Sequence, residues 1–531
     1  MKYIKHIVLS VLIASCSYAA YMPPDSYTAP STTIILGSSG YQMDADDDSL
    51  GFQKAIDDVH ANGGGHVVVP AGEYRVTGLV LKSEVHLIFE NGVSLHLPIE
   101  GPKKMSTIMF SIGAKGSRAN NVSVSSRNEW AEIYLPLSEK GLRVAALSNV
   151  ENFWISGLTI HDSRTVFSSL IFVWSGEEDG VALLPKHGLI ENIVAKNAHY
   201  GYGALQVHAG NDLHFRNITA IGGVATRLET GLPQMNLAAF GKPRGYIGLD
   251  DIAVEDTTSV NGQAALMMEA HTVKHGTVVA RDIKADGSEF AVHLSGGFVS
   301  KRKYTADQKY MTIDPGELTP GDFESITIEG VTATYRDHDI VTRFVHFKDY
   351  PEELHGKITQ IGRSLYGEPG SRGPSIAAVS IPDVNDPAVK VTHVTANGFK
   401  YHPDIISHKN QYTGSLQSLS KKAKIENAPD LPWAGADVAF DGPLLHKPSA
   451  SMGKVYAGTL ADTALYKGKS DKQLKYSKLF GPDWLSVSAD GRLRGKPVRS
   501  DSGENIFTVK VDRGMSGFDI AKLHITVGVG K

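Results

Sequence analysis

Leu213-His-Phe-Arg-Asn-Ile-Thr-Ala220 is one copy of a pattern that decides the fold of this 531-residue chain. Apolar residues alternate with other residues, a turn residue interrupts them, and an apolar and a small residue close the unit. A strand-turn-strand corner that recurs with loops of varying length is typical of a β-solenoid, whereas a β-sandwich does not need one repeated corner. The other copies are Phe153–Ile160, Ile247–Val254, Val278–Ala285, Ile326–Ala333 and Val389–Ala396.

The N-terminal part predicts a cap on this stack of strands. Asp46-Asp-Asp-Ser-Leu-Gly-Phe-Gln-Lys-Ala-Ile56 begins with capping residues and continues with helical apolar spacing. Gly63-Gly-Gly65, the strand His66–Pro70 and Ala71-Gly-Glu-Tyr-Arg75 follow. This order resembles the cap of pectin-lyase-like right-handed β-helices, which covers strand edges that would otherwise be unpaired. The acidic run 44–48 could bind calcium, but a solvated helix start is the favoured interpretation.

We therefore predict an all-β protein, a right-handed parallel β-helix with a C-terminal immunoglobulin-like β-sandwich module. The β-helix is expected over residues 28–420, with an insertion near 304–374 that folds over a groove, and a linker over 421–441. Residues 442–531 contain Gly481-Pro-Asp-Trp-Leu-Ser-Val-Ser-Ala-Asp-Gly-Arg-Leu-Arg-Gly-Lys-Pro497, which resembles immunoglobulin-like modules of exported bacterial enzymes. Its Trp484 is expected to serve the module core.

Residues 1–20 have the pattern of a secretory signal, with an early basic residue, a short apolar run and small residues. Ile13-Ala-Ser-Cys16 also resembles a lipobox, so we expect a secreted protein or an outer-membrane lipoprotein anchored through Cys16. Contact with a membrane is expected only through that lipid. Cys16 is the single cysteine, which excludes an internal disulfide and thiolate metal sites. A net charge of −4 argues against a nucleic-acid partner.

Val224-Ala-Thr-Arg-Leu-Glu-Thr-Gly231 places an arginine and a glutamate two residues apart in a strand-rich region. Residues i and i+2 of a strand project from the same face, so Arg227, Glu229 and Gly231 are expected to share one surface. A carboxylate beside a cation on such a surface suits the grip and cleavage of a charged sugar polymer. A structural ion pair is the plainer alternative.

Several runs follow one another in the order seen in iota-carrageenases, glycoside hydrolase family eighty-two, which the chain resembles over about residues 28–410. The resemblance implies hydrolysis of a sulfated red-algal galactan by inversion, with Glu229 as general acid assisted by Gln206 and His271. Arg227 fits a partner of the substrate or of a carboxylate. The runs are Thr165–Ile171, His187–Ile193, Asn197–Gln206, Arg227–Thr230, Ala264–His271, Arg372–Val379 and Ile406–Lys409.

The family has an aspartate as general base where this chain has Gly231. Inversion needs two carboxyl groups about 6.5–9.5 Å apart with a water between them. Three explanations stay open. Glu269 could replace the aspartate, His271 or His275 could act as base, or the protein could bind sugar without cleaving it.

Basic residues near these motifs predict an anionic substrate, because arginine and lysine bind sulfate esters well. Tyr202 is expected in the wall of the groove. A polysaccharide lyase is the rival enzyme class, but it usually needs an acidic calcium cluster on the coils, and none is seen near Glu229. We predict no cofactor and no metal. The predicted substrate-binding residues are Arg164, Arg227, Tyr202, Lys242, Arg244 and Lys274.

Overall fold

The computed structural model describes most of the chain. The described residues are 32–41, 43, 47–98, 107–136, 141–163, 165, 167–239, 242, 246–299, 317–338, 340–342, 344–363, 369–413, 424–425, 438–441, 444–466, 474–513 and 518–528. The predicted signal and Cys16 lie outside this part, as do Arg164 and Arg244. No helix within it is both long and apolar enough to cross a membrane.

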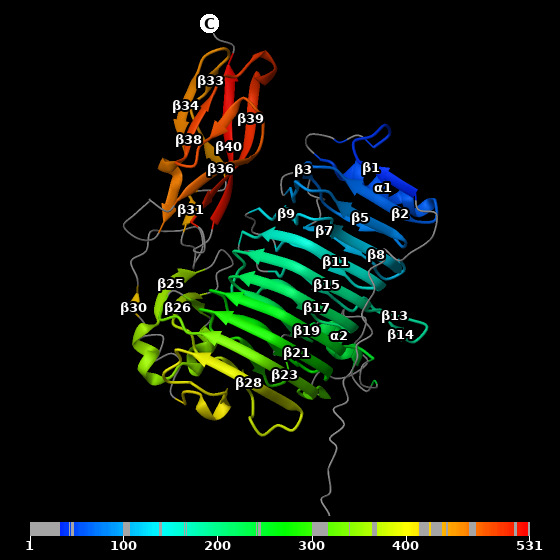
Figure 1. Ribbon diagram of the computed structural model, residues 1–531, viewed down its shortest axis with the longest axis vertical. Coiled ribbons are helices and arrows are strands. Elements are labelled where there is room, and N and C mark those ends of the chain that lie inside the picture. Colours follow the sequence, from blue (N-terminus) through cyan, green and yellow to red (C-terminus); the bar gives the residue numbers. More distant parts are fainter. Residues whose placement is uncertain are drawn as a thin grey trace, which may run out of the picture.

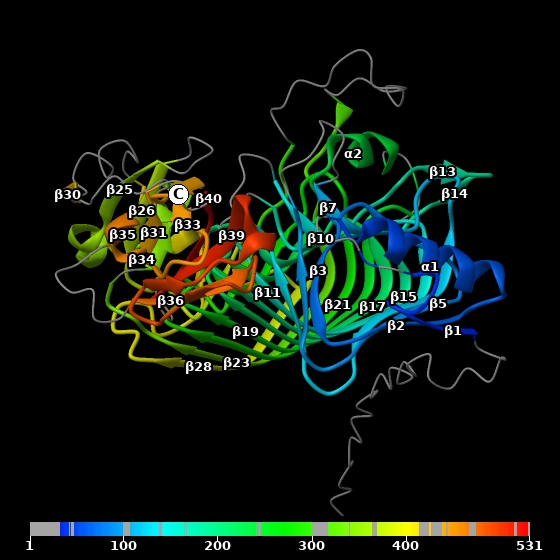
Figure 2. The ribbon, with the colours of Figure 1, turned by 90° about the horizontal axis from the view of Figure 1, so that it is seen from above.

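Two parallel sheets run along the molecule, and each turn of the chain adds one strand to each sheet (Figures 1 and 2). Neighbouring strands on both paths are parallel, which confirms a parallel β-helix. In order along the first path, the strands are β1 (Thr32–Ile35), β2 (Gly65–Val69), β5 (Val85–Phe89), β8 (Ala119–Ser126), β11 (Val150–His161), β15 (Lys186–Lys196), β17 (Gly210–Ile221), β19 (Leu249–Val260), β21 (His275–Asp286), β23 (Phe323–Thr334) and β28 (Val389–Asn397).

The second sheet carries the residues that matter for the site. Its strands are β4 (Leu79–Leu81), β7 (Ile108–Ile112), β10 (Arg143–Leu147), β12 (Leu170–Phe172), β16 (Gly203–Val207), β18 (Val224–Glu229), β20 (Ala264–Glu269), β22 (Val292–Ser295), β27 (Val379–Ile381) and β29 (Ile406–Ser407). The shorter strands β3 (Gly72–Arg75), β6 (Val93–His96) and β9 (Ala131–Tyr134) join the first sheet beside its main path.

The long strands of the first sheet bend at a corner residue with a left-handed backbone. This conformation is open to glycine and tolerated by asparagine and aspartate, which explains the turn residue of the sequence pattern. The copy predicted at Ile247–Val254 is out of register, because its Asp251 belongs to a different corner and the matching residue of β19 is Asp256. The aligned corner residues are Gly157 (φ 76°), Asn192 (57°), Asn217 (53°), Asp256 (48°), Asp282 (55°), Gly330 (73°) and His393 (55°).

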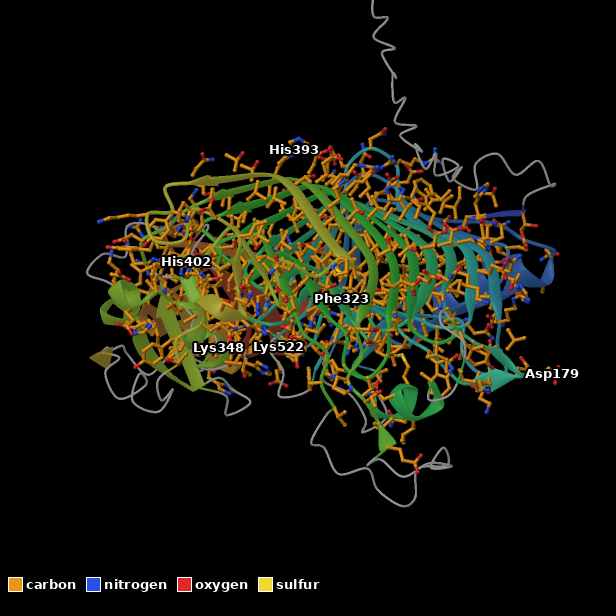
Figure 3. The ribbon with its side chains drawn as sticks, turned by 90° about the horizontal axis from the view of Figure 1, so that it is seen from below. Asp179, Phe323, Lys348, His393, His402 and Lys522 are labelled. Atoms are coloured by element: carbon orange, nitrogen blue, oxygen red, sulfur yellow. The ribbon has the colours of Figure 1, made fainter. Side chains whose placement is uncertain are left out.

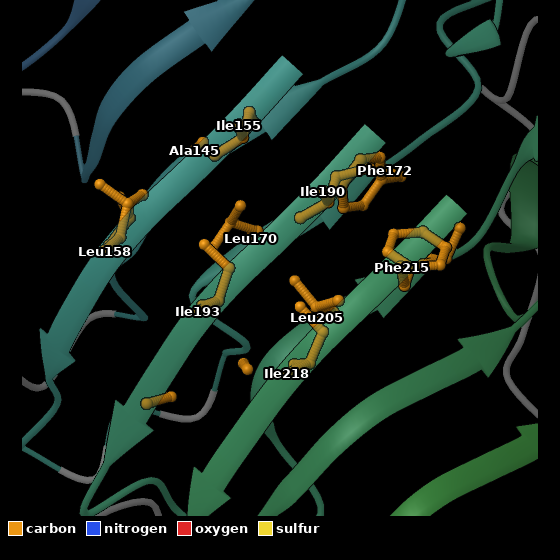
Figure 4. Close-up of a cluster of buried hydrophobic side chains, with 14 of the residues drawn as sticks. Ala145, Ile155, Leu158, Leu170, Phe172, Ile190, Ile193, Leu205, Phe215 and Ile218 are labelled. Atoms are coloured by element: carbon orange, nitrogen blue, oxygen red, sulfur yellow. The ribbon is translucent and has the colours of Figure 1, made fainter. Parts of the chain in front are cut away.

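Alternate residues of the strands point inward and fill the space between the sheets (Figure 4). Leu170, Leu205, Ile190 and Phe215 come from successive coils and are fully buried. The rings of Phe172 and Phe215 meet edge to face at 5.5 Å between centroids. Burial of this continuous apolar column is the main force that holds the coils in register, at about 25 cal/mol per Å² of apolar surface.

Helix α1 (Ser49–Ala61) covers the N-terminal end of the column, as predicted, although it starts later and extends further than the expected segment. Its buried residues, Phe52, Ala55, Ile56 and Val59, have the i, i+3, i+4, i+7 spacing of one helix face. At its start Asp48 accepts a hydrogen bond from the backbone N–H of Arg75 at 2.8 Å. Residues 44–46 of the acidic run lie outside the described part.

A side lobe packs against the outer face of the second sheet. It contains β24 (Ile340–Thr342), η3 (Phe344–Asp349), η4 (Glu352–Lys357), β25 (Thr359–Arg363) and β26 (Pro369–Gly373), and β30 (Lys424–Ile425) pairs with β25. Phe347 and Tyr350 join Met267 of β20 in a second apolar cluster. The buried carboxylate of Glu289 binds His346 Nδ1 at 2.8 Å and the hydroxyl of Thr342, which fixes η3 beside the sheet.

The C-terminal segment forms sheets around a core of its own, drawn in orange and red in Figure 1. Trp484 packs against this core, edge to face with Tyr456 and Phe507, and its indole N–H donates to Asn505. The immunoglobulin-like assignment stays a prediction. The strands are β31 (Val438–Phe440), β32 (Leu444–His446), β33 (Ala450–Ser451), β34 (Tyr456–Thr459), β35 (Ala464–Tyr466), β36 (Lys475–Phe480), β37 (Leu485–Val487), β38 (Arg492–Gly495), β39 (Gly503–Asp512) and β40 (Phe518–Gly528).

Candidate active site

Three neighbouring strands of the second sheet carry the main polar residues of the site. Gln206 of β16 lies opposite Arg227 of β18, and Glu229 lies opposite Glu269 of β20. Leu228, between the two charged residues of β18, belongs to the inner core. Arg227 and Glu229 therefore project from the outer face of the sheet, on the side expected from their spacing.

These side chains line a pocket of about 710 Å³ on that face. Gln206, Arg227, Glu229, Glu269 and His271 form part of its wall. The side lobe contributes Val345, His346, Lys348 and Asp349 from η3, and Figure 3 labels Lys348 there. The last coil adds His408 and Gln411. The side lobe thus forms one wall of the pocket and the sheet forms another.

Glu229 is held by several groups at once. Gln206 Nε2 donates to its Oε2 at 2.7 Å, and His271 Nε2 lies 3.1 Å from its Oε1. Arg227 Nε lies 2.9 Å from Oε2, as an ion pair rather than a directed hydrogen bond. Burial opposes the charged form, but Arg227 and the bond from His271 hold the pKa of Glu229 well below its usual value. Glu229 is therefore a carboxylate in the free site.

The guanidinium of Arg227 has its charge neutralised within the protein. It contacts Glu229, donates to Glu269 Oε2 at 3.4 Å and donates to the carbonyl of Gly201. Its carbon Cζ lies 5.6 Å from the centre of the Tyr202 ring. Burial alone lowers the pKa of Arg227, but the two carboxylates more than offset it and raise the pKa. Arg227 acts here as a partner of carboxylates.

His271 bridges the two glutamates and carries the labile proton of the site. Its Nε2 lies 3.1 Å from Glu229 and 3.7 Å from Glu269. Burial lowers its basicity, yet the hydrogen bond to Glu229 and the nearby charge of Glu269 raise the pKa of His271 to about 9. The imidazole is thus protonated at neutral pH. The alternative in which His271 accepts the proton of water stays a prediction, and the raised pKa of His271 does not favour it.

Gly231 lies against the imidazole of His271 and the carboxylate of Glu229. A Cβ atom added at Gly231 would lie 2.8 Å from His271 Cε1 and 3.1 Å from Glu229 Oε1. The imidazole therefore occupies space that any larger residue at position 231 would claim. A side chain at position 231 would require the imidazole to move.

His275, the other histidine considered as a base, does not line the pocket. It is completely buried, its Nε2 lies 3.2 Å from the hydroxyl of Thr230, and its ring meets Phe323 edge to face. Burial lowers the pKa of His275 to about 3, so it stays neutral. The open alternative of His275 as base is not favoured, because this residue begins β21 on the other sheet and does not line the pocket.

Two predicted substrate-binding residues are not brought to the pocket. Lys242 Nζ lies 3.7 Å from Glu177 and over the ring of Tyr246. Lys274 Nζ lies 3.4 Å from Asp322. Tyr202 and Arg227 do line the pocket. Both lysines stand close to the motifs in the sequence, but they lie on loops and do not line the pocket.

Among the pocket residues that the sequence analysis did not identify are Arg143, Phe167 and Lys348. Arg143 and Phe167 come from the coils before Gln206, and Lys348 comes from the side lobe. Phe167 stands inside a motif of the resemblance, which is the one signal that could have pointed to it. Arg143 and Lys348 stand in no recognisable motif.

Glu229, Glu269 and His271 offer ligand atoms that lie within 4.8 Å of one another, as a metal site would need. The protein already balances these charges, because Arg227 binds both carboxylates and His271 is protonated. A divalent cation would have to displace two positive groups, so the donor set fits a metal poorly.

The stacked parallel sheets and the carboxylate-lined pocket on their outer face place the chain among parallel β-helix proteins. No family model matches the chain. It is 32% identical over 285 residues to an iota-carrageenase from Zobellia galactanivorans and 30% identical over 298 residues to one from Alteromonas macleodii. These matches cover 52% and 55% of this chain, and 56% and 59% of the relatives, so the chain spans less than two thirds of their length.

Solved structures agree on the fold. An iota-carrageenase complexed to iota-carrageenan fragments has a TM-score of 0.65 at 21% identity, over 77% of this chain and 96% of that chain. An iota-carrageenase from A. fortis has a TM-score of 0.65 at 22% identity, over 75% and 94%. The sequence matches cover about half of this chain and the solved structures agree with it in fold, so the resemblance to the iota-carrageenases is confirmed.

Proposed function

We propose that this chain is a glycoside hydrolase that cleaves a sulfated red-algal galactan, iota-carrageenan or a related carrageenan. The observation that carries the proposal is Glu229, held by Gln206 and His271 on the outer face of the sheet within an open pocket. Its curated relatives are named iota-carrageenases, and one structural neighbour holds iota-carrageenan fragments.

Glu229 serves as general acid, and its proton comes from His271. In the free site the proton resides on the imidazole, because the pKa of His271 is about 9 and that of Glu229 is far below its usual value. Transfer across the 3.1 Å hydrogen bond gives a neutral imidazole and a protonated Glu229, which then donates to the oxygen of the scissile bond. Gln206 keeps the carboxyl group oriented.

Glu269 is the carboxylate that activates water. Its contacts with Arg227 and His271 are 3.4 and 3.7 Å, longer than the 2.9 and 3.1 Å contacts that Glu229 makes with the same two residues. Oxygens of the two glutamates lie within 4.8 Å, closer than the about 6.5–9.5 Å of inverting pairs. Inversion, which the resemblance implies, therefore requires Glu269 to turn away from His271 when substrate binds.

The decisive experiment measures new reducing ends on iota-, kappa- and lambda-carrageenan, agar and porphyran. Cleavage of at least one carrageenan is expected from the native protein. Glu229→Gln should lower kcat by about 10²–10⁴, the usual value of a general acid, with little change in substrate affinity. The anomer formed first, followed by NMR, should be inverted, whereas a retained anomer would make Glu269 a nucleophile instead.

The glycine at position 231 favours one alternative, a protein that binds anionic polysaccharide without cleaving it. That alternative predicts retention on a carrageenan affinity column with no new reducing ends on any substrate. A lyase on the same fold would instead release products that absorb in the ultraviolet.

We also propose that the protein is exported, on the strength of the signal-like segment 1–20. Fractionation of cells that express the native protein and Cys16→Ser tests this. Loss of membrane attachment in the variant, with export retained, supports a lipoprotein, and an unprocessed cytoplasmic protein contradicts export.

A further inference from the structure

Arg143 differs from the other arginine of the pocket in how its charge is balanced. Arg227 contacts two carboxylates. Arg143 Nη1 donates to the carbonyl of Ser168 at 3.1 Å, and no described carboxylate pairs with it. A guanidinium has five N–H donors, so most of its donors are available to a ligand.

The surroundings of Arg143 hold this cation at the pocket wall. Its Cζ lies 4.1 Å from the centre of the Phe167 ring, which supports the flat face of the guanidinium. Phe167 meets Tyr202 edge to face at 6.4 Å, and Tyr202 in turn lies beside Arg227. An aromatic bridge therefore connects Arg143 to the residues around Glu229, and Arg143, Phe167 and Tyr202 all line the same pocket.

Partial burial without an anion is unfavourable for a cation. Burial lowers the pKa of Arg143 to about 10, which still leaves the group charged at neutral pH. A bound anion with several oxygen atoms would balance the positive charge of Arg143 and accept hydrogen bonds from its remaining N–H groups. Sulfate esters have this chemistry, and arginine binds them through two parallel hydrogen bonds.

We propose that Arg143, supported by Phe167, forms a binding site for a sulfate ester of the polysaccharide, next to the bond that is cleaved. The identity of the polymer rests on the proposed function. The ability of Arg143 to bind an anion does not depend on it. Arg143 thereby helps to select sulfated over unsulfated chains.

The test compares Arg143→Met with Arg216→Met, both made in the Glu229→Gln background so that bound chains are not cleaved. Methionine keeps an apolar side chain of similar length against Phe167. Arg216 lies on the other sheet, in an ion pair with Glu191, and is the matched control. Calorimetry measures binding of a sulfated carrageenan oligosaccharide and of the same oligosaccharide after chemical desulfation.

Arg143→Met should weaken binding of the sulfated oligosaccharide by about ten- to a hundredfold and leave binding of the desulfated one unchanged. Arg216→Met should change neither. Equal losses on both oligosaccharides would show that Arg143 only supports the pocket wall, and no loss on either would remove it from the site. Both outcomes overturn the proposal.

A second arm separates this inference from the proposed function. Methyl sulfate binding is measured by NMR titration with the native protein and with Arg143→Met, in the absence of any polysaccharide. Weaker binding to the variant supports the anion site even if no carrageenan is cleaved. Identical titrations overturn the site even if the protein proves to be a carrageenase.

Discussion

At the residue scale, one proton is shared between His271 and Glu229, and Glu269 influences where it resides. The hydrogen bond from His271 to Glu229 and the nearby charge of Glu269 raise the pKa of His271 to about 9, so the proton supply should be lost as pH rises through that value. The pKa of His271 is higher in the folded protein than in the unfolded chain, so protonation of this residue favours the folded state. Its charge stabilises the folded site fully below about 6.5, and this contribution disappears as pH passes about 9.

Glu269→Gln removes one of the two carboxylates that raise the pKa of His271. The alkaline limb of the kcat/KM profile should therefore move to lower pH, together with a fall in the maximum rate. The measurement is the pH dependence of kcat/KM on a soluble carrageenan oligosaccharide. If Glu269 acts as base, azide should restore part of the rate of Glu269→Ala, and a profile that keeps its alkaline limb in Glu269→Gln would contradict the assigned role.

Gly231→Ala tests whether the absence of a side chain at this position is what admits His271. The new methyl group would lie 2.8 Å from the imidazole, so the ring must move and its bond to Glu229 must weaken. We expect a loss of about tenfold or more in kcat, below the full cost of losing the acid. Gly356→Ala is the control, since a Cβ there meets nothing within 4 Å, and it should leave the rate unchanged.

At the element scale, the corners of the long strands decide how the coils bend. Asn217 sits at such a corner with φ 53° and donates to Asn192 of the preceding coil at 2.7 Å. Asn217→Ala forces a Cβ-bearing residue without a compensating side-chain bond into the left-handed region and should cost about 1–2 kcal/mol of stability. Asn217→Gly should cost less, because glycine accepts the conformation. Urea unfolding measures both, and equal losses would contradict the corner argument.

The corner pattern and the strand parity could be predicted from the sequence, because both depend on neighbouring residues. Asn217 and Gly330 identified the bends, and the spacing of Arg227 and Glu229 identified the outer face. The register between coils could not be predicted, since loops of varying length separate Glu229 from Glu269. For the same reason Arg143 was not identified, and His275 was left open as a candidate base although it begins a strand of the other sheet.

At the scale of the whole molecule, the net charge of −4 does not prevent Arg143 and Lys348 from lining the pocket. Raising NaCl from about 0.05 to 0.5 M should raise KM for a sulfated oligosaccharide several-fold with little effect on kcat, since the Debye length falls well below about 10 Å. Lys242→Ala should keep both KM and this salt dependence, because Lys242 pairs with Glu177 away from the pocket. A KM that does not respond to salt would contradict an anionic substrate.

Gln206, Arg227, Met267, His293 and Ser380 occupy one aligned row across successive coils of the second sheet. Each turn of the chain contributes one member, while a different set of side chains, facing inward, maintains the frame. A substitution at one outward-facing position can therefore change the chemistry of the groove without disturbing the inward-facing residues that hold the coils together. The glycine at position 231, where the resemblance implies an aspartate, is one such change.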